Sequence, residues 1–532
     1  MATNTKGPLS MRLTRRQALA LFATAAPTLR SAYAQQPSIN VTSGPFQGTS
    51  QSLQAYRFPA WFADAKFGIW SHWGPQSAIE YGDWYARSMY IQGSSQYNYH
   101  VETYGHPSKV GYKDLIPQFK AARWDPDHLM DLYVKAGAKY FFSMGVHHDN
   151  FDMWNSKYQP RWNAVATGPK RDIVGTWAAA ARKRGLRFGV SEHLSNSYNW
   201  LAVSHLSDKT GPMAGIPYDG TDPAYADLYH DYTGQPANFA ATAKDMGRVA
   251  PDRWKLQYFN RIKDLVDQYT PDLLYTDGGI PFDEYGYSTV AEVYNVSAAK
   301  HNGKVESVYF SKQADQCAVG TCALDRERGV LDGISPTPWQ TDTCIGEWHY
   351  KRGVAYKTPK KVIDLLVDIV SKNGNLLLNF PLPNSGELDF AERETLEGIT
   401  QWMAVNNEAI YATRPWKIFG EGPSTKVVIK PNGKEFDPNE GKKPDLTAND
   451  VRFTTKGSTV YAFVQGWPQG TATIESFATN SPQNPPKVTA ITLLGRPEGL
   501  KFTQDATGLR VTLPTSKPTT ADIGITLKLI TA

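Results

Sequence analysis

Residues 126–150, PDHLMDLYVKAGAKYFFSMGVHHDN, decide the fold class of this chain. Residues 126–136 have the apolar spacing of an amphipathic helix, and Gly137 follows them as a helix-ending residue. The next run, AKYFFSMGV, has the length and aromatic content of a buried strand. A polar cluster comes directly after it: His147, His148, Asp149 and Asn150. The stretch therefore predicts one unit of helix, glycine, strand and polar turn.

Comparable units follow one another from about residue 58 to residue 380. Further strands are predicted at AKFGIWSHWG, LRFGVSEH, DLLYTDGG, ESVYF and GNLLLNF, and further helices at 172–184, 255–269 and 359–372. Such alternation is typical of a parallel α/β sheet. Polar residues follow four of the strand cores: His72, His147 with His148, Glu192 with His193, and Asp277. A closed barrel brings all carboxyl strand ends to one mouth, whereas a doubly wound sheet does so only at its switch point. We therefore predict a (β/α)8-like, TIM-type barrel.

The pattern changes after Trp402. Five runs alternate apolar and polar residues between Gly, Pro and Asn turns, with no helical period: PSTKVVIKPNG, RFTTKGSTVYAFVQGW, KVTAITLLGR, GLRVTL and IGITLKLI. This spacing predicts an antiparallel β-sandwich. We expect a catalytic barrel domain over residues 35–414 and a sandwich domain over residues 415–532. We interpret the sandwich as a cap on the barrel rather than as an independent carbohydrate-binding module.

The N-terminus has the features of an export signal. From Met11 the sequence reads MRLTRRQALALFATAAPTLRSAYAQQ, in which Arg15 and Arg16 precede an apolar stretch with a small-residue end. This order is typical of a twin-arginine signal over residues 1–34, cleaved near Ala34, and a basic helix of a cytoplasmic protein is the alternative. No later stretch has the roughly 20 apolar residues of a membrane span. We expect the mature protein in the periplasm or outside the cell.

The charge and the cysteine content argue against a nucleic-acid-binding protein and against a disulfide-rich protein. The formal charge is only +5, from 56 Lys and Arg against 51 Asp and Glu, and no long basic run occurs, so nucleic acid is not an expected partner. The cysteines are Cys317, Cys322 and Cys344, an odd number that argues against a disulfide framework. Cys317 and Cys322 could close a small loop, and the sequence leaves their pairing open.

The adjacent His147 and His148 allow three interpretations: a metal site, buried core histidines, or recognition of a polar ligand. Neighbouring residues of an ideal strand point to opposite faces, so both rings cannot bind one metal there, although at a strand end both can reach the mouth. A zinc site needs a third ligand and usually spaced pairs such as HExxH, which the sequence does not offer. We predict ligand recognition and no metal.

Asp277 stands where the apolar strand of PDLLYTDGG ends, and the two glycines after it leave room for a substrate. An Asp-Gly turn that merely closes the strand is the other interpretation. A glycosidase needs two carboxyl groups, and Asp325, Glu327 and Glu347 are the candidates for the second. Glu327 lies between two arginines, whose charges would lower its pKa. A proton donor needs a raised pKa, so this position is an objection to Glu327. Aromatic residues make up 12% of the chain, and several tryptophans lie near these motifs, where their rings suit stacking on a sugar.

Seven segments in order along the barrel carry a resemblance to a known family. They are WFADAKFGIWSHWG (61–74), GDWYARSMY (82–90), FKAARWDPDHLMDLYVKAGAKYFFSMGVHHDNFDMWNSKY (119–158), GPKRDIVGTWAAAARKRGLRFGV (168–190), PDLLYTDGG (271–279), PWQTDT (338–343) and VDIVSKNGNLLLNFPLPNSGELD (367–389). Together they resemble the α-L-fucosidases of glycoside hydrolase family 29. The resemblance implies an exo-acting, retaining enzyme with a barrel and a β-sandwich, which acts on a fucosylated oligosaccharide or glycoconjugate and needs no metal and no organic cofactor.

The resemblance also implies roles for individual residues. Asp277 corresponds to the nucleophile, and Glu327, which precedes an Arg-Gly pair, resembles the acid/base of several members, with Glu347 and Asp325 as alternatives. Asp83 and Trp84 match a pair beside the fucose in which the acid is often Glu. Contacts to the sugar are implied for His72, His147 and His148, and we expect further contacts from Tyr275, Glu192, His193 and Trp339.

Three departures from the family pattern stand out. Ser191 occupies the place of a sugar-contacting Tyr, Gln340 follows Trp339 where many members have Glu, and Tyr309-Phe310-Ser311 replaces a frequent Asn-Asp-Arg stretch. We expect these changes to affect aglycone preference more than the reaction. Two alternatives stay open at this point: a fucose-binding protein with weak or no turnover, and a related glycosidase that acts on α-L-galactosides.

Overall fold

The computed structural model describes residues 1, 39–231, 250–427, 438–442 and 444–532. The predicted signal, residues 1–34, lies outside the described residues except for Met1. The barrel strands and the C-terminal sheets belong to one compact unit, Val41–Ala532. Among the helices of the described residues, none has the length and apolar content needed to cross a membrane.

Within the described residues, eight strands form one parallel sheet in the order β6-β5-β4-β3-β2-β1-β8-β7. An isolated parallel bridge between Asp325 and Gln340 joins the two edges, so the sheet nearly closes on itself. This confirms the predicted (β/α)8-like barrel. The strands are β1 Phe67–Ser71, β2 Tyr140–Val146, β3 Arg187–Glu192, β4 Leu273–Thr276, β5 Val308–Ser311, β6 Ala323–Leu324, β7 Trp339–Cys344 and β8 Gly374–Asn379.

Two strands of the barrel escape detection in the sequence. The six predicted runs correspond to β1 to β5 and β8. β6 has only two residues, and β7 reads WQTDTC, a polar segment that is buried along its whole length. Because strand prediction rests on apolar periodicity, a polar strand whose side chains find partners inside the barrel leaves no signal.

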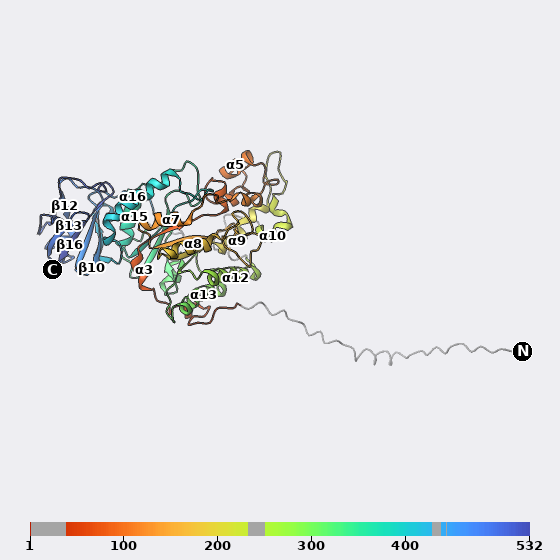
Figure 1. The fold of residues 1–532 in the computed structure, drawn as a ribbon, viewed down its shortest axis with the longest axis horizontal. Helices are drawn as coiled ribbons and strands as arrows, with labels where there is room; N and C mark the ends of the chain where they lie inside the picture. Colours follow the sequence, from red (N-terminus) through yellow and green to blue (C-terminus); the bar gives the residue numbers. More distant parts are fainter. Residues whose placement is uncertain (2–38, 232–249, 428–437, 443) are drawn as a thin grey trace. The chain divides into compact units, whose positions relative to one another are not determined.

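Helices cover the outside of the barrel, and Figure 1 shows α7, α8, α12 and α13 around it. Side chains cap several of them, as where Asp125 and Asp172 accept from His128 and Gly175 backbone N–H groups. The four predicted helices correspond to α7, α8, α12 and α15, whereas α13 and α16 were not predicted. The α-helices are α2 Ser50–Leu53, α3 Ala60–Ala65, α4 Tyr85–Ser88, α5 Ser95–Thr103, α6 Tyr112–Leu115, α7 Pro126–Lys135, α8 Ile173–Lys183, α9 Leu194–Trp200, α10 Ala226–Tyr229, α12 Asp252–Tyr269, α13 Glu284–Lys300, α14 Ala314–Ala318, α15 Pro359–Val370 and α16 Phe390–Asn406.

Beyond α16 the described chain forms two antiparallel sheets, in the orders β13-β16-β11-β10-β9 and β12-β15-β14. Phe453 and Leu527 of the first sheet and Ile474 and Val511 of the second lie in one core, which confirms the predicted sandwich. The predicted strand at 423–433 differs, because Pro423–Lys426 is a 3-10 helix and 428–433 lies outside the described residues. The strands are β9 Arg414–Glu421, β10 Val451–Lys456, β11 Thr459–Val464, β12 Thr471–Ile474, β13 Val488–Leu493, β14 Phe502–Asp505, β15 Gly508–Thr512 and β16 Ile525–Thr531.

The sandwich lies against two helices of the barrel. Arg452 of β10 donates to Asp368 of α15 at 2.5 Å, and Trp402 of α16 donates to the carbonyl of Gly524 at 2.9 Å. Figure 1 shows β10, β13 and β16 beside α15 and α16. The sandwich therefore covers barrel helices.

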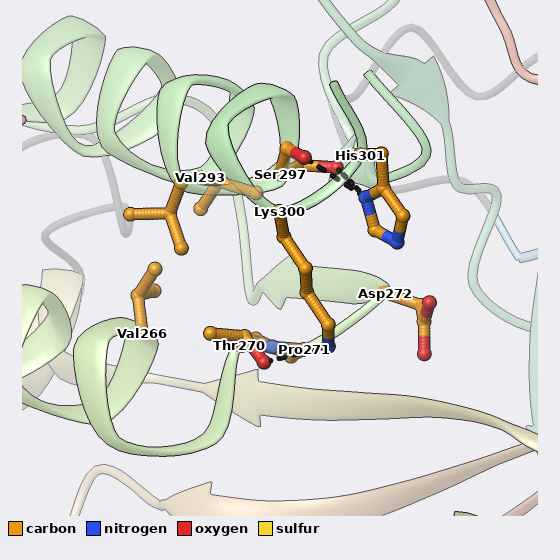
Figure 2. Close-up of a pocket in the computed structure, with 9 residues that line it drawn as sticks. Val266, Thr270, Pro271, Asp272, Val293, Ser297, Lys300 and His301 are labelled. Carbon is orange, nitrogen blue, oxygen red and sulfur yellow. Dashed lines mark hydrogen bonds between the residues drawn. The ribbon is translucent and has the colours of Figure 1, made fainter. Parts of the chain in front are cut away.

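A small pocket lies at the amino end of the barrel strands (Figure 2). Asp272 precedes β4 there, and Lys300 at the end of α13 donates to the Thr270 hydroxyl at 2.9 Å. The pocket holds about 10 Å³, close to the least that one water molecule needs. It is therefore too small for a sugar.

Candidate active site

Histidines from several strand ends gather at the carboxyl end of the barrel. His72 follows β1, His147 and His148 follow β2, His193 follows β3, and His349 follows β7. All these rings are buried. Ring centroids lie 4.5 Å apart for His72 and His349 and 4.7 Å apart for His147 and His193. The structure thus brings the four predicted histidines together and adds His349.

Neighbouring side chains orient two of these rings. The Gln76 amide nitrogen lies 2.9 Å from Nδ1 of His147, while its oxygen accepts from the backbone of Ala86 at 3.3 Å, so the proton of a neutral His147 ring sits on Nε2. Asp83 lies 2.6 Å from Nδ1 of His349. Burial, together with the neighbouring histidines, lowers the pKa of His72 and of His147 well below the usual value. The neutral rings are suited to hydrogen bonds with hydroxyl groups.

The same cluster also has spacing that a small cation would need. One ligand atom each from His72, Asp83, His147 and His349 lies within 4.8 Å of the others. However, His349 and Asp83 already contact each other. Nε2 of His147, the ring nitrogen that does not face Gln76, carries the ring proton and so cannot bind a cation. Nδ1 of His72 and Nε2 of His349 are buried and have no hydrogen-bond partner among the described residues. Buried polar atoms of this kind call for a polar ligand, and sugar hydroxyl groups would supply it.

Asp277 follows β4 and lies beside these histidines. Its carboxylate is 3.1 Å from Nε2 of His148 and 3.4 Å from Nδ1 of His193, and it also pairs with the ammonium group of Lys312. Burial alone would raise the pKa of Asp277, but the charge of Lys312 and the two histidines outweigh it and hold that pKa well below its usual value. Asp277 is therefore ionised at neutral pH, as a nucleophile must be.

Glu327 pairs with the same Lys312 ammonium group. Burial raises the pKa of Glu327 to about 7; Lys312 opposes this shift, and the charges of Asp342 and Asp277 add to it. Of the two flanking arginines that argued against a proton donor, Arg328 turns elsewhere, since it donates to the Cys344 sulfur at 2.9 Å and lies over the Trp348 ring. Glu327 can therefore hold a proton near neutral pH.

The shared lysine also limits the distance between the two acids. Because Asp277 and Glu327 each accept a hydrogen bond from one nitrogen, those two oxygens lie at most about 6 Å apart. Retaining glycosidases hold their carboxyl groups about 5 to 5.5 Å apart, and inverting enzymes about 6.5 to 9.5 Å apart. The arrangement therefore fits double displacement.

Two further acids lie next to this pair, inside the barrel. Asp342 of β7 accepts from the Tyr275 hydroxyl at 3.0 Å, and Asp325 accepts from the Gln340 amide at 2.7 Å. Both acids are about 1% exposed. Asp325, one of the alternatives for the proton donor, is therefore part of the barrel interior, while Glu347, the other alternative, is half-buried beside Trp348.

Comparison with known proteins agrees with this geometry. The family model for alpha-L-fucosidase matches residues 33–408, and that for the alpha-L-fucosidase C-terminal domain matches residues 443–530. This chain belongs to the α-L-fucosidase family. As a member of that family it is a glycoside hydrolase.

The α-L-fucosidase relatives match this chain over most of their length. The tissue α-L-fucosidase of Rattus norvegicus is 30% identical over 492 residues, which cover 90% of this chain and 91% of the relative. The tissue α-L-fucosidase of Homo sapiens is 30% identical over 491 residues, 90% of each chain. The structure of Thermotoga maritima α-fucosidase in complex with fucose has a TM-score of 0.68 and 26% identity, covering 91% of this chain and 100% of that one.

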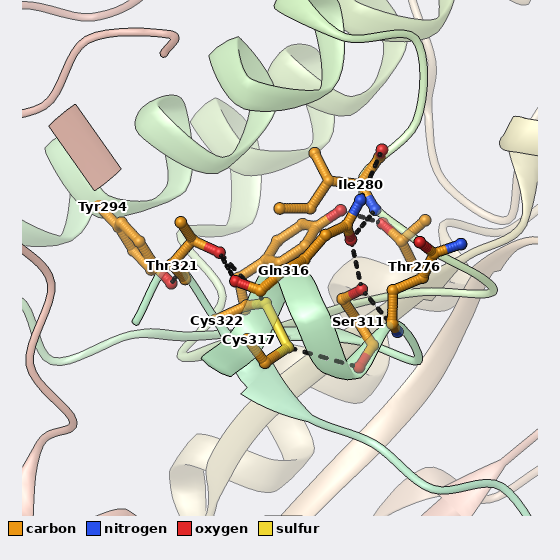
Figure 3. The surroundings of a disulfide bond; sticks show 10 residues. Thr276, Ile280, Tyr294, Ser311, Gln316, Cys317, Thr321 and Cys322 are labelled. Atoms are coloured by element: carbon orange, nitrogen blue, oxygen red, sulfur yellow. Dashed lines mark hydrogen bonds between the residues drawn. A yellow bond between two sulfur atoms is a disulfide. The ribbon is translucent and has the colours of Figure 1, made fainter. Parts of the chain in front are cut away.

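In this member of the α-L-fucosidase family a disulfide closes a short loop after β5, next to the contacts that tie the segments carrying Asp277 and Lys312 together. Cys317 and Cys322 are joined, which answers the question that the sequence left open. Gln316, beside Cys317, accepts from the Ser311 hydroxyl and from the backbone of Ile280, both at 2.8 Å (Figure 3). The backbone N–H of Lys312 also donates to the carbonyl of Gly278 at 2.8 Å.

The other predicted contact residues differ in their positions. Trp84 is 40% exposed, and its ring is perpendicular to that of His148, with the centroids 6.1 Å apart. Tyr275 lies in the barrel interior, bound to Asp342. Glu192 faces α12 and the barrel wall, where it accepts from Leu194, Thr276 and Tyr258. Trp339 starts β7 at the opposite end of the barrel and donates to the Lys372 carbonyl, so it does not face the mouth.

Sequence reasoning missed three residues that the structure places in the candidate site. Lys312 follows β5 at the place of the changed Asn-Asp-Arg stretch, so a search for a replacement cation there would have found it. His349 lies two residues after Glu347, and a rule that every strand is followed by a polar residue at the mouth would have included it. Asp342 belongs to a strand that has no apolar signal, and only the fold reveals it.

Proposed function

We propose that this chain is an exo-acting, retaining α-L-fucosidase in which Asp277 is the nucleophile and Glu327 is the acid/base. The observation that carries the assignment is the Lys312 ammonium group shared by the two acids. It holds them at a separation that fits retention, while Asp277 is ionised and the pKa of Glu327 is about 7.

In the first step the Asp277 carboxylate attacks the anomeric carbon of the terminal fucosyl residue. Glu327 donates its proton to the glycosidic oxygen as the bond to the aglycone breaks. In the second step Glu327 accepts a proton from water, the water oxygen attacks the anomeric carbon, and the ester bond to Asp277 breaks. Two inversions leave the released fucose with its original anomeric configuration.

Lys312 supports the change of role of Glu327 between these steps. In the free enzyme its ammonium group is shared with ionised Asp277. Once Asp277 is esterified it carries no charge, so the lysine is no longer shared with Asp277, acts more strongly on Glu327 and lowers its pKa. The carboxyl group that was an acid is then suited to act as a base.

We assign recognition of the fucose hydroxyl groups to the buried histidines. Nε2–H of His147 is a donor, and Nδ1 of His72 and Nε2 of His349 have no hydrogen-bond partner among the described residues. Trp84 offers an exposed aromatic face beside them. The substrate class is a fucosylated oligosaccharide or glycoconjugate.

Gln340, one reason to consider binding without turnover, lies inside the barrel between Asp325 and Tyr140. Its replacement of a glutamate therefore changes no group at the mouth and leaves Asp277 and Glu327 in place. This supports turnover.

The test is azide rescue with an aryl α-L-fucoside. Asp277→Gly is expected to lose about 10³-fold or more in kcat, and azide should restore reaction and give the β-fucosyl azide. Glu327→Ala should keep the covalent step for a good leaving group, and azide should then give the α-fucosyl azide, since it attacks the fucosyl-enzyme.

Glu347→Ala is the matched control and should behave as the wild type. Wild-type turnover by Asp277→Gly, or α-fucosyl azide from it, would contradict the nucleophile assignment. Faster hydrolysis of an aryl α-L-galactoside than of the fucoside would overturn the substrate class.

We also propose that the chain is exported and that its mature form begins near Gln35, with a barrel domain to residue 414 and a sandwich domain from residue 415. The paired arginines and small-residue end of the leader support this, and so does the disulfide, which persists in oxidising compartments. N-terminal sequencing of protein from the periplasm is the test. Replacement of Arg15 and Arg16 by lysines should retain the precursor in the cytoplasm, and unchanged export of that variant would refute the twin-arginine route.

A further inference from the structure

Two buried acids near Glu327 take no part in the bond-breaking steps. Asp342 receives a hydrogen bond on Oδ2 from Tyr275, and Asp325 receives one on Oδ2 from Gln340. The Oδ1 atom of each acid is buried and receives no donor from the described residues. Two carboxyl groups inside one barrel therefore each have an unsatisfied oxygen.

The fold brings these two acids together. Asp325 forms the parallel bridge to Gln340 that joins the edges of the barrel, and Asp342 is two residues further along β7. The two carboxyl groups lie within hydrogen-bond reach of each other. Carboxylates are acceptors only, so such a bond exists only when one of the two groups holds a proton. One proton between them would satisfy the unsatisfied oxygens.

The balance of charge supports the same conclusion. Four carboxyl groups, those of Asp277, Asp325, Glu327 and Asp342, act on the one ammonium group of Lys312. If all four were ionised, this buried group would carry a net charge of about −3, which a low-dielectric interior strongly disfavours. Protons must therefore reside on some of the acids.

The residues that face the pair divide into neutral donors and charged groups. Tyr275 and Gln340 donate hydrogen bonds to it, and the Tyr140 hydroxyl of β2 contacts Gln340 at 3.1 Å. The charged or titratable neighbours are Asp277 after β4, Lys312 after β5 and Glu327 after β6. Burial, followed by the charge of Asp342, raises the pKa of Asp325 well above its usual value.

We propose that Asp325 and Asp342 share one proton and act as a single negative charge that keeps Glu327 protonated before the glycosidic bond breaks. The pair touches no substrate, so its members are positioning residues for the proton of Glu327. The proposal rests on the assignment of Glu327 as the acid/base.

The test compares the pH dependence of kcat/KM for an aryl α-L-fucoside in the wild type, Asp325→Asn, Asp342→Asn and the double variant. In each single variant an amide N–H replaces the shared proton and one negative charge remains, so the loss of activity at high pH should stay within about 0.3 pH unit of the wild type. The double variant has no charge at the pair. Its activity should be lost at a pH lower by about one unit, because Glu327 then gives up its proton more readily.

Two results would overturn the proposal. The first is that each single variant shifts the high-pH limb by at least half as much as the double variant does. That result would show that the two acids carry separate charges. A double variant with the wild-type limb would show that the pair does not act on Glu327.

Infrared difference spectra at neutral pH supply a readout that does not depend on activity. The wild type minus Asp342→Asn should show one lost protonated-carboxyl band, as should the wild type minus Asp325→Asn, and the absence of this band in both spectra would refute the shared proton. The variant Glu327→Gln distinguishes a failure of the acid/base assignment from a failure of the shared-proton proposal. If it leaves the high-pH limb unchanged, the acid/base assignment fails, while the infrared result still decides whether the proton is shared.

Discussion

Asp277 and Glu327 accept hydrogen bonds from the same nitrogen, the ammonium group of Lys312. One cation thus lowers the pKa of both the proposed nucleophile and the proposed acid/base. The three side chains come from the ends of three consecutive barrel strands, β4, β5 and β6. We expect the balance between them to set the pH range of activity.

Lys312→Gln should shift the whole pH profile upward. Activity requires Asp277 without its proton and Glu327 with its proton, and Lys312 lowers the pKa of both acids. Removing the cation raises both pKa values, so both limbs of kcat/KM move to higher pH, and the maximum should fall about 10²-fold because a preorganised charge is lost. Lys312→Arg, which keeps the charge, should retain the wild-type limbs. A profile of unchanged position in Lys312→Gln would contradict the role of the shared cation.

The wild-type enzyme should lose activity as the pH rises through about 7. Burial raises the pKa of Glu327 to about 7, and the first step needs this group protonated. The effect should be strong for an aryl fucoside with a poor leaving group and weak for one with an activated leaving group, which departs without a proton. Measurement of kcat/KM against pH for both substrates checks this. Equal high-pH limbs for the two substrates would argue against proton donation by a group of this pKa.

The double variant Cys317→Ser/Cys322→Ser should lose both stability and turnover. Opening so short a loop should cost about 2 kcal/mol of unfolding free energy. Turnover should fall because Gln316, next to Cys317, ties the loop after β4 to the loop after β5. Thermal unfolding and kcat, each with and without a reductant, are the measurements. The reductant should affect the wild type only, and a response of the double variant would point to Cys344 instead.

Arg261→Met should destabilise the protein strongly. Arg261 of α12 pairs with Asp152 and donates to Asn150, and both members of the ion pair are fully buried. Removing the arginine leaves a buried carboxylate unpaired, which should cost about 3 to 5 kcal/mol in urea unfolding at pH 7. Asp152 and Asn150 belong to the loop that follows His148, so KM should rise as well. Lys183→Met, at an exposed ion pair with Asp127, is the control and should leave both quantities unchanged.

Sequence patterns were sufficient for the elements with strong periodicity. The helix of residues 126–136 and the strand after it are confirmed as α7 and β2, because apolar spacing and a terminal glycine are local features. β7 was missed, since a strand that buries Thr341, Asp342 and Thr343 has no apolar period. Its polar side chains are tolerated only because the barrel supplies partners such as Tyr275.

The positions of the site residues were likewise predictable from the sequence only in part. The convergence of His72, His147 and Asp277 was predictable, because each ends a strand and parallel strand ends share one mouth. The placement of Trp339 was not, because its position along β7 depends on the register with β8, where it lies opposite Gly374 at the start of both strands.

The sequence by itself determined the order of the elements, the family and the kinds of reactive group, because periodicity, turn residues and motifs are properties of short segments. Only the tertiary structure decided how the acids behave. Arg328, one of the two arginines beside Glu327 in the chain, turns to Cys344, while Lys312, from another strand end, pairs with Glu327. A pKa depends on burial and on distances through space, and closure of the barrel sets both.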